Sequence, residues 1–199
     1  MLMRLSTFLL LFICSNSFAQ TNNYQKLLDT AIGGHGSLFV YSKPLKVIRL
    51  DIKELWFYFE NARDYSNQKL DTVMFSQIIQ NALVADTTLW TDYELPNFIL
   101  INDRAATVSK RYVVEKFKLT DKKQIKHFTK YVNKFNSTSI SDRVICYYSR
   151  PIFDNSKTFA IVQWDNGHSY LGGGGGIMLY QLQSDQTWKE YCVILNWRY

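Results

Sequence analysis

The sequence predicts an α+β protein, in which a mixed helix and strand N-terminal part is followed by a C-terminal four-stranded antiparallel meander. Runs with helical spacing and short apolar runs alternate over the first 142 residues, whereas residues 143–199 hold four apolar runs separated by Asn, Asp, Ser and Gly. Strands gathered at one end favour an α+β arrangement over parallel βαβ units. The hydrophobic fraction of 47% and the aromatic fraction of 16% exclude a disordered chain.

The first residues have the pattern of a secretory signal. Arg4 provides positive charge, residues 8–14 are apolar, and Ser17-Phe18-Ala19 places small residues before a cleavage site at Gln20. This pattern predicts a signal peptide over residues 1–19 and a single α+β domain over residues 20–199. We therefore expect export to the periplasm or the extracellular space. The apolar run is shorter than the roughly 20 residues of a membrane span, so no transmembrane anchor is expected.

The N-terminal elements follow in order. Apolar residues at i, i+3, i+4, i+7 and i+8 predict a helix over residues 24–32, which Gly33-Gly34 ends. Strands are expected over residues 38–41 and 45–50. Residues 51–62 keep helical spacing, but the aromatic block at 56–59 is equally typical of a strand, and the spacing favours the helix.

The central elements have clearer signals. Asp71 is a candidate N-cap for a helix over residues 72–83, and Asp121 for a basic helix that reaches about residue 136. The apolar runs at 98–101 and 112–119 predict two strands. In the basic helix, we expect four apolar residues to face inwards: Ile125, Phe128, Val132 and Phe135.

The C-terminal runs at residues 143–148, 158–164, 177–183 and 188–197 are expected to form the meander. Cys146 lies on the first strand and Cys192 on the fourth. Three strand steps separate them by roughly 14 Å, whereas a disulfide needs Cα atoms within about 7 Å. An oxidising compartment favours a disulfide and the strand order favours two free, buried thiols, so both states remain open.

A resemblance accompanies this C-terminal pattern. It is carried by Ser149-Arg150-Pro151-Ile152-Phe153, the apolar run 159–162, Gly172 to Gly176, Leu179-Tyr180 and Trp188-Lys189. Together with the Ser17-Phe18-Ala19-Gln20 ending, these residues resemble a pattern in uncharacterised secreted proteins of Bacteroidota-type bacteria. The resemblance covers about the last 50 residues. It implies an exported protein with a strand meander, and it assigns no activity and no catalytic residue.

The nine glycines form two clusters, and each cluster contains a histidine. The clusters lie at residues 33–36, with His35, and at 167–176, with His168. Phosphate binding is not expected, because such a loop should lead into a helix, whereas Gly176 leads into an apolar run typical of a strand. A wide connection or a close approach of backbones explains the glycines best. A loop that closes over a ligand is the alternative, with these candidate binding residues: His35, Trp164, Asp165, His168 and Tyr170.

No pattern for catalysis is present. The sequence lacks a Gly-x-Ser-x-Gly elbow and any paired His or Cys metal motif, so no catalytic residue, metal or cofactor is expected. These observations favour a non-catalytic binding or interaction module. The alternative is a small cell-envelope hydrolase that uses the loops around His35 and His168.

The charge pattern concerns partners. The chain holds 23 basic and 17 acidic residues, a mild excess, and nucleic acid is a poor partner for an exported domain. Lysines concentrate in the basic helix, over Lys122–Lys134. This cluster is typical of a solvated helix face, but it also fits an acidic partner. We expect the partner to be an envelope ligand or an envelope protein.

Overall fold

The structure is a computed structural model, and it describes residues 23–33, 38–47, 52–65, 71–167 and 172–198. A helix over residues 23–33 comes first. The elements that follow are β1 (Phe39–Tyr41), α2 (Ile52–Tyr65), α3 (Thr72–Leu83), β2 (Ile99–Ile101), α4 (Lys110–Lys116), α5 (Lys122–Ser137), the 3-10 turn η1 (Ile140–Asp142), β3 (Tyr147–Tyr148), β4 (Ile152–Phe153), β5 (Phe159–Asp165), β6 (Gly174–Leu182) and β7 (Trp188–Arg198).

The C-terminal strands form the expected antiparallel meander. Its order is β3-β5-β6-β7, and β4 pairs with β5 beside this path. The α+β class is therefore confirmed. None of the described helices has the length and apolar character needed to cross a bilayer.

The N-terminal strands extend the edge of this meander. β1 pairs with β2 in parallel, and bridges from Val40 to Cys146 and from Leu45 to Ser149 place β1 beside the segment that contains β3. The Cys146 backbone N–H donates to the Phe39 carbonyl at 2.9 Å, and its carbonyl accepts from Tyr41 at 2.8 Å. The sequence predicted these strands but not this long-range pairing.

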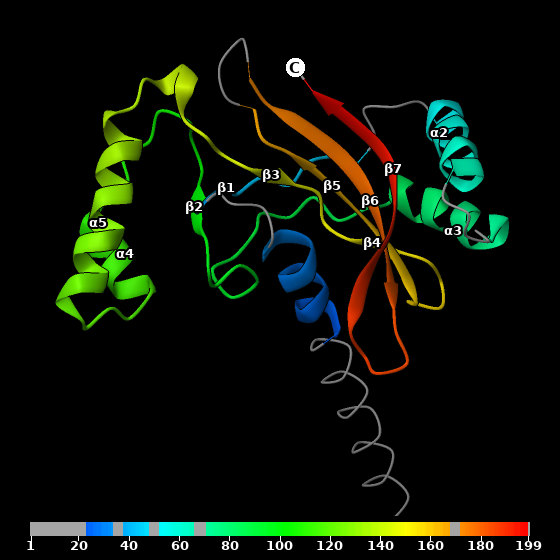
Figure 1. The fold of residues 1–199 in the computed structure, drawn as a ribbon, viewed down its shortest axis with the longest axis horizontal. Coiled ribbons are helices and arrows are strands. Elements are labelled where there is room, and N and C mark those ends of the chain that lie inside the picture. The colour runs from blue at the N-terminus through cyan, green and yellow to red at the C-terminus, as the bar shows by residue number, and fades with distance from the viewer. Residues whose placement is uncertain (1–22, 34–37, 48–51, 66–70, 168–171, 199) are drawn as a thin grey trace, which may run out of the picture.

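Helices cover both faces of the sheet (Figure 1). In β5, Ile161 packs into the core under α3, whereas Ala160 and Val162 face the core of the helix over residues 23–33. This alternation follows from the two-residue period of a strand. Because both faces are buried, β5 is apolar at consecutive positions.

The α4–α5 pair lies at the end of the molecule opposite α2 and α3 (Figure 1). A third core joins α5 to β1 and β2 and contains Val132 and Ile99. In it, the rings of Phe39 and Phe135 stack with their centroids 4.0 Å apart. The predicted inward stripe is buried at Val132 and Phe135, and Phe128, partly buried, also packs against this core. Ile125, at the N-terminal end, is only partly buried.

The helix predictions agree with the structure in three places. Residues 52–65 form a helix, so the helical spacing of this segment, and not its aromatic block, indicated the correct element. Asp71 accepts a hydrogen bond from the Val73 N–H, and Asp121 accepts from Lys123 and Gln124, so both are N-caps as expected.

The strand predicted over residues 112–119 is wrong. Residues 110–116 form α4, whose pairs at i and i+4 include an Arg111–Glu115 ion pair and the contact residues Val113 and Phe117. Val113 lies in the core that α4 shares with α5, β1 and β2, whereas Arg111 and Glu115 on the opposite side are exposed. A short helix suits this one-sided apolar burial better than an isolated strand. The β-branched and aromatic residues gave a misleading local signal.

Cys146 and Cys192 are not joined by a disulfide in the structure. Cys146 is buried against β1, and Cys192 is partly buried on β7. The strand order on which this expectation rested, with β5 and β6 between them, is confirmed.

Candidate functional site

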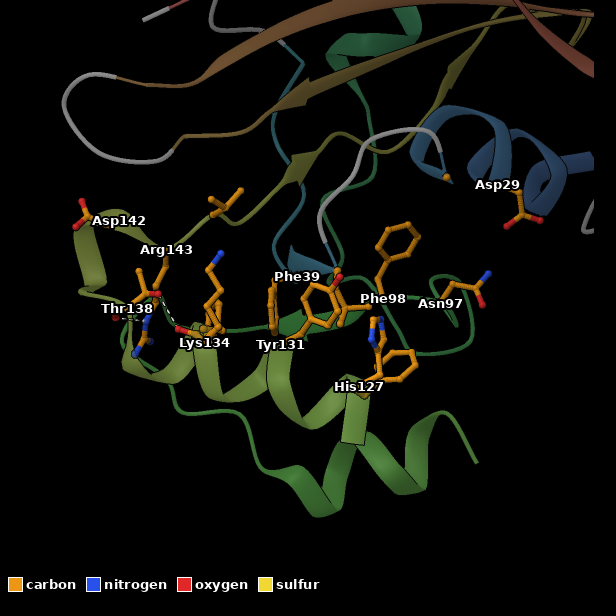
Figure 2. A pocket seen from close by; sticks show the side chains of 15 residues that line it. Asp29, Phe39, Asn97, Phe98, His127, Tyr131, Lys134, Thr138, Asp142 and Arg143 are labelled. Carbon is orange, nitrogen blue, oxygen red and sulfur yellow. Dashed lines mark hydrogen bonds between the residues drawn. The ribbon is translucent and has the colours of Figure 1, made fainter. Parts of the chain in front are cut away.

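A groove of about 880 Å³ lies between α5 and the end of the helix over residues 23–33 (Figure 2). Its walls combine segments that are far apart in the sequence. The lining residues are Asp29, Gly33, Leu38, Phe39, Asn97, Phe98, His127, Phe128, Tyr131, Lys134, Phe135, Thr138, Asp142, Arg143 and Val144. We call this hollow the aromatic groove.

One face of α5 forms the long wall of the groove. His127, Tyr131 and Lys134 recur at i, i+4 and i+7, so their side chains share a face of the helix. The His127 ring meets the Tyr131 ring edge-on, with centroids 4.9 Å apart. Tyr131 remains 49% exposed, which leaves its ring available to a ligand.

The C-terminal end of α5 carries a buried cation. Arg143 is 6% exposed and donates to the carbonyls of Arg104 and Ala106, both at 2.8 Å, and of Asn136 at 3.2 Å. Its guanidinium lies 4.7 Å from the centroid of the Phe135 ring. Cations are favourable at a helix C-terminus, so Arg143 both closes α5 and gives this end of the groove a positive charge.

The outer face of α5 carries exposed lysines. We call Lys122, Lys123, Lys126, Lys130 and Lys134 the lysine face. A shallow hollow on this face is lined by Lys123, Lys126, His127, Thr129, Lys130 and Asn133. His127 lines both this hollow and the aromatic groove, so the two surfaces are continuous.

The two described residues among those predicted for the binding site, Trp164 and Asp165, do not line the aromatic groove. Trp164 and Asp165 lie at the end of β5, opposite Tyr148 and Tyr147, and Trp164 packs against the core under the helix over residues 23–33. His35, His168 and Tyr170 lie outside the described residues.

The glycines of β6 have a structural explanation. A Cβ atom on Gly175 would meet the Trp197 ring and lie 2.6 Å from the Trp164 carbonyl, and one on Gly176 would lie 3.2 Å from the Trp164 Nε1. The predicted close approach therefore holds for the strand part of this cluster.

Two polar clusters outside the groove tie loops to the core. Arg150 is 8% exposed and forms an ion pair with Glu94. Its guanidinium lies over the Trp90 ring, 4.4 Å from the centroid, and donates a hydrogen bond to the Tyr24 hydroxyl at 3.0 Å. Burial raises the pKa of Tyr24 although Arg150 opposes this shift. Because Arg150, Glu94 and Tyr24 pair with one another, the cluster is a structural connection between the N-terminal helix and the following loops.

The second cluster joins α4 to the loop before β2. Lys116 pairs with Asp92, and the Tyr112 hydroxyl donates to the same carboxylate at 3.2 Å. Burial and the neighbouring Asp92 charge raise the pKa of Tyr112 to about 12. Tyr112 is therefore a protonated hydrogen-bond donor at neutral pH.

Among the described residues, no group of three or more His, Cys, Asp or Glu side chains has the arrangement of a metal site. Comparisons with protein-family models, curated proteins and solved structures gave no match. The aromatic groove and the lysine face are the described surfaces on which aromatic rings and exposed lysines gather.

The groove was not predicted, because its walls come from residues 29–33, 38–39, 97–98 and 127–144. Periodicity identifies the buried face of each helix but does not say which segments will line a common hollow. One signal was present: His127 and Tyr131 place two rings at i and i+4 beside the lysines of α5.

Proposed function

We propose that this protein is a non-catalytic binding protein and that the aromatic groove is its ligand site. The main support is that α5 and the loop before β2 direct aromatic rings into one hollow. The half-exposed Tyr131 lies there beside Phe98. Ligand sites are typically concave and mostly apolar, with a few polar groups that set orientation.

The polar groups of the groove indicate the character of the ligand. Lys134 and Arg143 supply positive charge near the C-terminal end of α5, and Phe98 and Phe128 supply apolar surface. Asp29 and Asp142 also line the hollow, so the positive charge is local rather than uniform. This combination supports a ligand with a flat or apolar body and an anionic group.

The test uses 1-anilinonaphthalene-8-sulfonate, a fluorescent aromatic anion, as the probe. We expect it to bind the folded protein, and Tyr131→Ala should weaken binding roughly fivefold or more, because an aromatic contact is lost. Phe57→Ala is the matched control, since Phe57 is also an exposed helical aromatic residue, 62% exposed on α2. Equal affinities for the wild type and Tyr131→Ala would contradict the proposal.

We also propose that the protein acts outside the cytoplasm, in the periplasm or beyond it. The support is the charged, apolar and small-residue pattern of residues 1–19. N-terminal sequencing of protein isolated from its native cells should begin at Gln20. An intact Met1 would contradict this part of the proposal.

A further inference from the structure

The lysine face of α5 departs from the usual placement of charge on a helix. Lys122 and Lys123 occupy the first turn, where the helix dipole favours acidic residues, and the first turn holds no acidic side chain. Lys122, Lys126, Lys130 and Lys134 also recur at i and i+4, where like charges repel one another. The Asp121 N-cap offsets this charge only at the N-terminal end.

Apart from the Asp121 N-cap, no acidic residue of the described chain pairs with the lysine face. None of its five lysines makes an ion pair with another described residue, and all five are exposed. By contrast, the neighbouring Arg111 and Lys116 of α4 each have an acidic partner. Lysines placed in this way lower the stability of the helix, and no ion pair among the described residues offsets the loss. Such an unfavourable local arrangement is expected where the residues serve binding.

We infer that the lysine face binds a linear carboxylated polysaccharide, which continues into the aromatic groove past His127. This inference rests on the proposed function, because the groove supplies the rings on which sugar faces stack. Four lysines at i, i+4 spacing extend over about 18 Å of helix, which suits an extended chain with repeated negative charges.

The surroundings of α5 favour a polysaccharide over a lipid surface. The large apolar side chains Val132 and Phe135 are buried against β1 and β2, so α5 has no free apolar face to insert into a bilayer. Tyr131 and His127 instead present ring surface directly beside the lysines. The expected export of the protein favours an envelope polysaccharide over a nucleic acid, although both have negative charge and stacking surfaces.

The experiment measures binding of polygalacturonate to the full mature protein by calorimetry, at about 50 mM and about 200 mM salt. Polyanion binding weakens steeply with salt, so we expect a clear loss of affinity over this range. Lys126→Glu/Lys130→Glu should lower the affinity at least tenfold. This double variant should fold, because each new carboxylate gains a lysine neighbour, Lys122 or Lys134.

The matched control is Lys43→Glu/Lys46→Glu, which changes net charge equally at two exposed lysines outside α5. We expect it to change the affinity by less than about threefold. An equal loss in both double variants, or no binding of polygalacturonate, would overturn the inference. Tighter binding of poly(dT), or stronger binding of vesicles that contain phosphatidylglycerol, would also overturn it.

The two proposals can fail separately. If polygalacturonate does not bind but the fluorescent anion still binds at Tyr131, the groove remains a ligand site and only the polysaccharide inference is lost. If the Tyr131 variant binds the fluorescent anion as the wild type does, the groove proposal is lost whatever the lysine face binds.

Discussion

The Trp197 ring lies where a side chain on Gly175 would have to begin, so these two residues explain why the start of β6 is glycine. They are opposite each other in the β6–β7 ladder. On the other face, Trp164 approaches Gly176 in the same way. Gly175 and Gly176 therefore allow two indole rings to pack directly on the backbone of the strand.

Gly175→Ala should lower the free energy of unfolding by about 1–3 kcal/mol, since the added methyl group overpacks the site between Trp197 and the Trp164 carbonyl. Gly33→Ala is the control, because no atom lies within 4 Å of a Cβ added there and the residue is helical. It should have no cost or should stabilise by about 0.5–1 kcal/mol. Urea denaturation measures both, and an unaffected Gly175→Ala would show that the indole packing is not tight.

Local pattern was sufficient for much of this fold. Caps at Asp71 and Asp121, helical spacing and the four C-terminal runs predicted α3, α5 and the meander. The pattern failed at α4, where Tyr112, Val113 and Val114 favour a strand locally, but the segment forms a helix with Val113 in the core and Arg111 and Glu115 exposed. The pairing of β1 with Cys146 and the groove both depend on contacts between segments that are far apart in the sequence. The periodicity of one segment does not predict such contacts.

Phe135→Ala should lower the free energy of unfolding by about 3–5 kcal/mol, because this ring is 5% exposed, stacks on Phe39 and lies under the Arg143 guanidinium. Phe128→Ala is the matched comparison on the same helix. Since Phe128 is only partly buried, its loss should be clearly smaller. Equal losses in thermal and urea unfolding would contradict the orientation of α5.

Glu94 should contribute to the pH dependence of stability. Its burial opposes ionisation, but hydrogen bonds from Arg150 and Thr91 outweigh that effect and hold its pKa below the usual range. A lowered folded-state pKa means that the contribution is present above the unfolded-state pKa of about 4.3 and is lost as the pH falls through the folded-state value.

Glu94→Gln should therefore reduce stability at pH 7 by about 1–3 kcal/mol and flatten the loss of stability below about pH 4.3. The control is Glu115→Gln, which breaks the exposed Arg111 pair and should cost less than about 0.5 kcal/mol. Urea denaturation over an acid pH series measures both effects. A parallel pH profile for Glu94→Gln and the wild type would show that the Arg150 pair does not set the acid sensitivity.

The two thiols should be unreactive in the native protein. Burial raises the pKa of Cys192 to about 11, so only about one thousandth of it is thiolate at pH 8. Cys146 is 4% exposed beside β1. Ellman's reagent should react slowly with native mature protein and should titrate two thiols after denaturation without reductant. A titration of none would show a disulfide and a sheet in which these strands come together.

Lys122→Glu should stabilise the protein while it weakens the binding of a polyanion. Lys122 is the first residue of α5, where a carboxylate interacts favourably with the helix dipole and stands four residues before Lys126. The Asp121 N-cap carboxylate next to it opposes part of this gain. We expect a rise of about 0.5–1 kcal/mol in the free energy of unfolding, measured by urea denaturation.

Lys134→Glu provides the opposite case on the same helix. Lys134 lies in the last turn, where the dipole favours a cation, so its reversal to Glu should lower stability by about 0.3–1 kcal/mol. Both variants remove the same charge from the lysine face, so both should weaken polygalacturonate binding. If both variants lose affinity while their stabilities change in opposite directions, the lysines bind the polyanion directly. If instead affinity rises and falls with stability, the lysine face has no direct part in binding.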